Sequence, residues 1–134
     1  LEIYRAEFRP SPALSAPRVM VGVPVVAAES DIEAERLATS MYLRTLGILR
    51  GQRAGLQPPV ESMEGLWTRG EQLAVAERMA LMVAGGRERV RDGLQQILDA
   101  TQADELILVS ETWDRAARLR SFEIIAEAAG NSAT

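Results

Sequence analysis

A continuous apolar run near the end of the chain constrains its fold more than any other feature. Leu106 to Val109 read Leu-Ile-Leu-Val with no polar alternation, and Ser110 and Glu111 follow directly. A strand of this kind has to be covered on both faces, which is typical of a parallel sheet in an α/β protein. We therefore expect parallel strands that alternate with helices.

Two more segments are predicted to be strands. Residues 18–28 are rich in valine, and the short run 81–84 ends at Gly85 and Gly86. Pro24 lacks an N–H group, so it predicts a bulge, a strand end or an edge position. Ser30 to Glu33 and Thr68 to Glu71 match capping boxes that open helices. Helices are expected at the following positions: 1–9, 31–50, 69–79, from 87 and from 114.

Composition narrows the class of protein. The chain has 134 residues, enough for one domain over 1–134, within which 51–80 is predicted to be an irregular insertion and 131–134 a frayed tail. The net charge of −4 argues against nucleic acid. With no cysteine and no histidine, no metal site is predicted. The absence of a long apolar run or a signal peptide predicts a cytoplasmic protein with no membrane contact.

Three phrases of the sequence resemble one known family. They are RVMVGVPVVAAESDIEAERLATS, LMVAGGRERVRDGLQQILDATQADELILVS and DRAARLRSFEIIAE. In this order they resemble the C-terminal half of a luciferase-like (bacterial luciferase family) flavin-dependent monooxygenase, which folds as a (β/α)8 TIM barrel. The resemblance implies strands six to eight with their helices. One departure is that Gly86-Arg87 stand where the family more often has Ser-Pro or Thr-Pro.

The resemblance also implies a function for a longer protein. Such a protein would bind FMN and oxidise a small organic substrate, although a deazaflavin stays an open alternative. A full barrel needs about 250 residues or more, and this chain supplies three strands of eight. The family's histidine-based chemistry and most of its flavin contacts would precede Leu1, so no catalytic residue is assigned. We expect the chain alone to be inactive.

Four residues at predicted strand ends are candidate cofactor contacts. Gly85 and Gly86 could bind a phosphate at a helix start, or they could form a tight turn without a ligand. Ser110 and Trp113 would face the mouth of a barrel, where Trp113 could form the wall of a cofactor site. Alternatively, Trp113 packs under the last helix and Asp114 only caps that helix.

Several charged and aromatic residues favour structural roles. The basic run Arg115, Arg118 and Arg120 is interpreted as a solvated face that pairs with nearby acids, Glu111 and Glu123. Trp67, with Met63 and Leu66, is interpreted as an anchor for the irregular segment. Asp104 and Glu105 precede a strand, at the end of a barrel that usually serves stability.

A second function class remains open. Three parallel strands leave two unpaired edges, which favour pairing with another copy of the chain or with a missing half. The alternative to the flavoenzyme is therefore a stand-alone, non-catalytic α/β association module that acts as a homo-oligomer.

Overall fold

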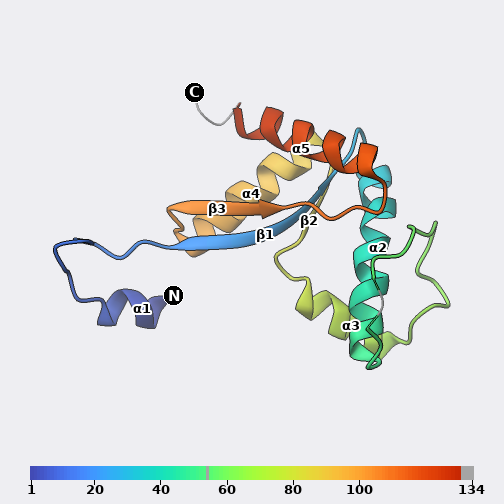
Figure 1. Ribbon diagram of the computed structural model, residues 1–134, viewed down its shortest axis with the longest axis horizontal. Coiled ribbons are helices and arrows are strands. Elements are labelled where there is room, and N and C mark those ends of the chain that lie inside the picture. Colours follow the sequence, from blue (N-terminus) through green and yellow to red (C-terminus); the bar gives the residue numbers. More distant parts are fainter. Residues whose placement is uncertain (54, 131–134) are drawn as a thin grey trace.

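The computed structural model of the protein describes residues 1–53 and 55–130. The predicted tail at 131–134 lies outside them. Figure 1 shows an elongated molecule in which α1 lies apart at one end and α2 crosses the other end of the sheet. The elements are α1 (Glu2–Glu7), β1 (Met20–Ala27), α2 (Asp31–Leu49), α3 (Arg69–Arg78), β2 (Val83–Gly85), α4 (Arg87–Thr101), β3 (Glu105–Val109) and α5 (Arg115–Gly130).

The three strands form one parallel sheet, as the sequence predicts, and the fold class is α/β with flanking helices. Their order is β2-β1-β3. β3 pairs with the first part of β1, where Met20 faces Glu105, and β2 pairs with the last part, where Val25 faces Val83. Consecutive strands of a closed barrel adjoin one another, so the position of β3 beside β1 differs from a simple slice of a cylinder.

Helices lie on both faces of the sheet. α4 and α5 cover one face, where Val23 and Val25 of β1 pack with Val90 and Ile124. α2 packs on the opposite face, at the carboxyl end of the strands, against Val26. Crossovers between parallel strands are right-handed. Because β1-to-β2 and β2-to-β3 run in opposite directions across the sheet, their helices α2 and α4 fall on opposite faces.

The central strand contains Pro24 at a position where it costs no hydrogen bond. The ladder bonds of β3 go to odd-numbered residues of β1, as the bonds from Glu105 N–H to Val19 O indicate, and Ala28 N–H donates to Gly85 O of β2. The backbone N–H and C=O groups of even-numbered residues of β1 therefore point toward β2, which begins to pair only at Val25. Pro24 thus lies in the central strand, beside a stretch of its edge that no described strand pairs.

The predicted helix caps are observed with one difference. Thr68 and Glu71 form a complete capping box at α3. Ser30 Oγ accepts from Glu33 N–H at 3.2 Å at the start of α2. The Glu33 carboxylate, however, accepts from the Arg36 guanidinium at 2.7 and 2.9 Å. A guanidinium one turn ahead offers the carboxylate two charge-assisted bonds, which are stronger than one bond to a backbone amide.

The irregular segment is anchored by apolar side chains. Residues 51–53 and 55–67 form no helix or strand, whereas α3 follows within the predicted insertion. Met63 is buried in a small cluster with Leu46 and Val75, and Trp67 packs against that cluster. The predicted anchor is thus present, except that Leu66 remains 43% exposed.

Candidate functional site at the carboxyl ends of the strands

The four candidate residues all lie where strands end. Gly85 is the last residue of β2 and Gly86 caps α4, while Ser110 and Trp113 follow β3. In a parallel sheet the carboxyl ends of all strands lie at the same end of the sheet, which is where ligands bind in open α/β sheets. The fold therefore places these residues at the end of the sheet where a cofactor would be expected.

The helix start at Gly86 already holds a carboxylate of the protein. Gly86 N–H donates to Asp31 Oδ1 at 2.7 Å, which joins the first turns of α2 and α4. A phosphate bound at this helix start would have to displace Asp31 from the amide. Gly85 lies tightly beside the stem of Arg89, because a Cβ built on Gly85 would come within 2.7 Å of it.

The Ser110 hydroxyl is engaged inside the protein. It lies 2.8 Å from Ser121 Oγ of α5, and both serines are buried. Ser121 Oγ in turn accepts from Ala27 N–H of β1 at 2.9 Å. This chain of hydrogen bonds joins β1, the end of β3 and α5, so it gives Ser110 a structural role.

Trp113 is the candidate residue whose side chain is exposed to solvent. It is 52% exposed, so it does not pack under α5 as one reading of the sequence suggested. Asp114 does cap that helix, since its Oδ2 accepts from Ala117 N–H at 2.8 Å. An exposed indole beside the strand ends could stack on a flat ring.

Several ion pairs lie near the carboxyl ends of the strands. Arg120 Nε donates to Glu29 at 2.6 Å and Arg120 Nη1 donates to Glu123 at 2.9 Å. The hydrogen bond from Arg120 lowers the pKa of Glu29, and these carboxylates raise the pKa of Arg120. The prediction that Arg120 pairs with Glu123 is confirmed, whereas Glu111 pairs with Arg44 of α2.

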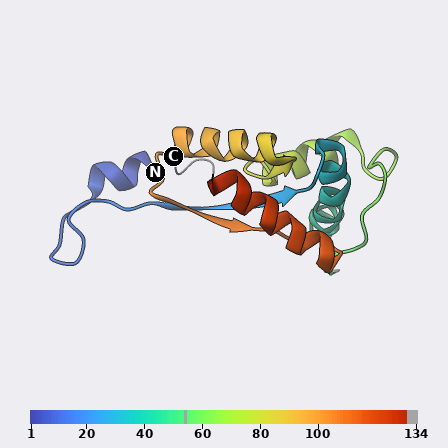
Figure 2. The same ribbon diagram turned by 90° about the horizontal axis from the view of Figure 1, so that it is seen from above.

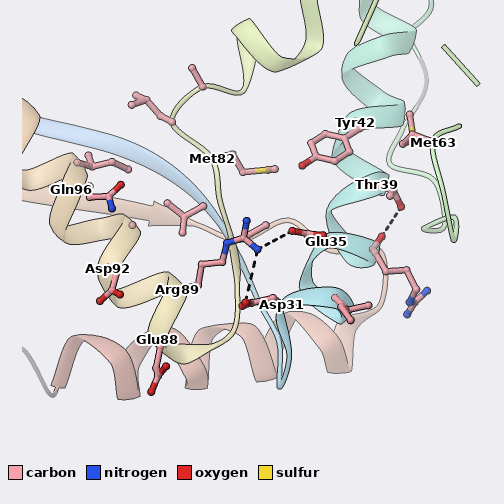
Figure 3. Close-up of a pocket in the computed structure, with 18 of the residues that line it drawn as sticks. Asp31, Glu35, Thr39, Tyr42, Met63, Met82, Glu88, Arg89, Asp92 and Gln96 are labelled. Carbon is pink, nitrogen blue, oxygen red and sulfur yellow. Dashed lines mark hydrogen bonds and ion pairs between the residues drawn. The ribbon is translucent and has the colours of Figure 1, made fainter. Parts of the chain in front are cut away.

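A cleft that sequence reasoning did not find lies between α2 and α4 beside β2 (Figure 3). Its volume is about 1120 Å³. Arg89 crosses its mouth and contacts Glu35 at 2.8 Å and Asp31 at 3.9 Å. Tyr42 and Met82 line its inner wall (Figure 3), and burial, with a smaller effect of Glu35, raises the pKa of Tyr42. No sequence signal could reveal this cleft, because its walls are distant in the sequence.

The acidic pair at the start of β3, Asp104 and Glu105, makes structural contacts. Asp104 Oδ2 accepts from Val19 N–H at 2.7 Å, and Glu105 forms an ion pair with Arg18. Among residues 1–53 and 55–130, no three potential acidic ligands gather as a metal site would require. Within the same residues, no helix is both long and apolar enough to cross a membrane.

The residues present do not form a complete flavin site by themselves. Of the four candidate positions, Gly86 binds Asp31 and Ser110 binds Ser121, while Gly85 is packed against Arg89. Only Trp113 offers a free surface. A flavin at this place would therefore need contacts beyond these four positions, and we derive no catalytic step from this chain alone.

Comparisons with known proteins show which proteins the chain resembles. No family model matches the chain. It is 39% identical over 124 residues to a luciferase-like monooxygenase of Escherichia coli, covering 92% of this chain and 37% of that protein. It is also 45% identical over 127 residues to the uncharacterized protein YvbT of Bacillus subtilis, covering 95% of this chain and 38% of YvbT.

A solved structure agrees with these relatives. The crystal structure of apo-MsnO8 is similar to this chain with a TM-score of 0.74 and 34% identity, over 96% of this chain and 40% of that one. The chain therefore resembles luciferase-like proteins over nearly its whole length, as the three phrases of its sequence predicted. It spans less than two fifths of the length of the curated relatives that it matches.

Proposed function

We propose that this chain is part of an FMN-dependent luciferase-like monooxygenase. The observation that carries this proposal is the 39% identity, over 92% of the chain, to a luciferase-like monooxygenase. In the whole protein, bound flavin would supply the redox chemistry toward oxygen and a small organic substrate, and the polypeptide would orient the reactants and exclude water.

The chain alone is expected to be inactive. It spans only 37% of the E. coli relative, and three of its four candidate cofactor positions are used in internal contacts. Catalysis would then require residues from the rest of a longer polypeptide. A cytoplasmic location and a homo-oligomeric state stay predictions.

Flavin binding tests this expectation directly. FMN is titrated into the isolated chain while flavin fluorescence is followed, and a deazaflavin is titrated in a parallel series. The full-length E. coli relative, prepared in the same way, serves as the positive control. We expect no stoichiometric change with this chain. Tight one-to-one binding of either flavin by the chain alone would contradict the proposal of inactivity.

A second candidate function is a non-catalytic association module. The observation that favours it is the outer edge of β3, because none of the described strands pairs with it. The length of the natural polypeptide separates the two candidates. A product of roughly 300 residues or more favours the monooxygenase, since a complete barrel needs about 250. A product that begins at or just before Leu1 favours the module.

A further inference from the structure

The cleft between α2 and α4 has an apolar interior. Tyr42 and Met82 form its inner wall (Figure 3), and Trp67 lines it from the irregular segment. Ile32 and Leu81 also line the cleft and are 82% and 45% exposed. Its volume of about 1120 Å³ exceeds the range of roughly 300–1,000 Å³ that is typical of small-molecule pockets. A groove of this kind fits the apolar side of a helix.

The charged side chains along this cleft are mostly acidic. Among the described residues, five carboxylates and two guanidinium groups line it, on Asp31, Glu35, Glu61, Glu88, Asp92, Arg36 and Arg89. Both guanidinium groups are paired within the chain, because Arg36 binds Glu33 and Arg89 binds Glu35. The Glu88 carboxylate, in the first turn of α4, has no ion pair or hydrogen bond within the described residues. A partner for the cleft should therefore combine cationic groups with apolar ones.

Helix α5 carries a surface of that chemistry. We define the α5 stripe by Arg115, Arg118, Leu119 and Phe122, whose spacing of three and four residues places them on one side of the helix. Leu119 is 56% exposed and Phe122 is 44% exposed. Neither guanidinium of the stripe forms an ion pair within the described residues, whereas Arg120, on another side of α5, is held by carboxylates. The stripe therefore offers both the cations and the apolar groups that the cleft requires.

The α5 stripe does not face the cleft of its own chain. Ile124 and Ile125, on the buried side of α5, lie in the main core and fix the helix against the sheet. In Figure 1 α5 runs above the sheet, while the segment from α3 to β2, which lines the cleft, lies below it. In Figure 2 α5 again lies on the outside of the molecule. The stripe and the cleft can therefore meet only between two copies of the chain.

We propose that the α5 stripe of one copy docks into the cleft of a second copy. In this arrangement Leu119 and Phe122 pack on the apolar wall, and Arg118 faces Glu88. Because the two surfaces differ, the contact is head to tail and generates a ring or a filament. This inference rests on the homo-oligomeric state predicted above and not on flavin chemistry, which the flavin titration tests separately.

Charge reversal tests the proposal by sedimentation velocity over a wide range of protein concentration. Arg118→Glu changes the α5 stripe, and Glu88→Lys changes the cleft. Arg9→Glu is the control, because it makes the same change of charge at an exposed position after α1, which lies apart at one end of the molecule (Figure 1). Circular dichroism checks that each variant folds. Arg115→Glu or Asp92→Lys replaces a variant that does not fold.

The mass of the unsubstituted chain is expected to rise with concentration. Arg118→Glu and Glu88→Lys should each raise the dissociation constant about tenfold, because like charges then face each other, while Arg9→Glu leaves it unchanged. An equal mixture of the two variants should associate again, since each variant then meets the opposite charge on the other.

Three results would overturn the proposal. The first is an unsubstituted chain that stays monomeric at every concentration. The second is association that both variants leave unchanged, which would assign the contact to another surface such as the edge of β3. The third is a mixture of the two variants that does not associate again, since the α5 stripe and the cleft would then not be in contact.

Discussion

At the scale of single residues, two buried serines differ in whether their hydroxyl groups are hydrogen-bonded. Ser121 and Ser40 are both fully buried. Ser121 Oγ accepts from Ala27 N–H and contacts the Ser110 hydroxyl, whereas Ser40 Oγ has no hydrogen-bond partner among the described residues. A buried hydroxyl is stabilising only where it is bonded, so the same substitution at the two positions should have opposite effects.

The paired substitutions test this reasoning. Ser121→Ala leaves the Ala27 amide and the Ser110 hydroxyl unbonded and is expected to lower the free energy of unfolding by about 1–3 kcal/mol. Ser40→Ala removes an unbonded hydroxyl from α2 and should be neutral or stabilising. Urea unfolding followed by circular dichroism measures both. Equal losses in the two variants would contradict the role given to the hydrogen-bond chain.

At the scale of secondary-structure elements, one carboxylate fixes α3 against α2. Glu71 accepts from Thr68 N–H within the capping box and from the Arg50 guanidinium at the end of α2. Arg50 first, and then the backbone bond at Thr68, lower the pKa of Glu71 from 4.5 to about 2. The carboxylate is therefore ionised in the folded state at a pH where it would bind a proton in the unfolded chain.

Stability at acid pH should depend on this carboxylate. Because the folded pKa is depressed, its contribution is complete above pH 4.5 and is lost as the pH falls toward about 2. Glu71→Gln is expected to flatten this part of the curve of urea midpoint against pH. Glu64→Gln, in the exposed segment before α3, provides the control. If the urea midpoint of Glu71→Gln fell with acid pH as in the unsubstituted chain, the ionised Glu71 carboxylate would not be what stabilises α3 against α2.

At the scale of the whole molecule, α1 and the core contribute unequally to stability. α1 contains no buried residue, and Arg5 forms its hydrogen bonds to the end of α4. Ile124 of α5, in contrast, is 1% exposed within the main core. The sheet and the helices α2, α4 and α5 should therefore fold without α1.

Removal of residues 1–9 tests that division. We expect the shortened chain to keep its far-ultraviolet circular dichroism and to lose no more than about 1 kcal/mol of unfolding free energy, since none of residues 1–9 is buried. Ile124→Ala, which opens a cavity in the core, should cost about 2–5 kcal/mol. A chain that unfolds without residues 1–9 would show that α1 is part of the folding unit.

Much of the fold could be predicted because local chemistry determines it. The apolar runs predicted the three strands, Thr68 and Glu71 predicted the start of α3, and Gly51 predicted the end of α2, where its φ of +74° follows the cap. The positions of the candidate site residues at strand ends followed from the same pattern. Their contacts did not, because Asp31 meets Gly86 across 55 residues and Ser121 meets Ala27 across 94.

The sequence by itself determined which segments are strands and helices, that the strands run in parallel, and the resemblance to luciferase-like proteins. Apolar periodicity and helix caps depend on residues that are close in the sequence, so they can be recognised in a single sequence. Only the tertiary structure decided that β3 lies beside β1, that Asp31 and Ser121 occupy the donors and acceptors near the candidate site, and that Met20, Ile107 and Val109 stay exposed on the sheet. Those outcomes depend on which distant surfaces meet, and a linear pattern does not specify that.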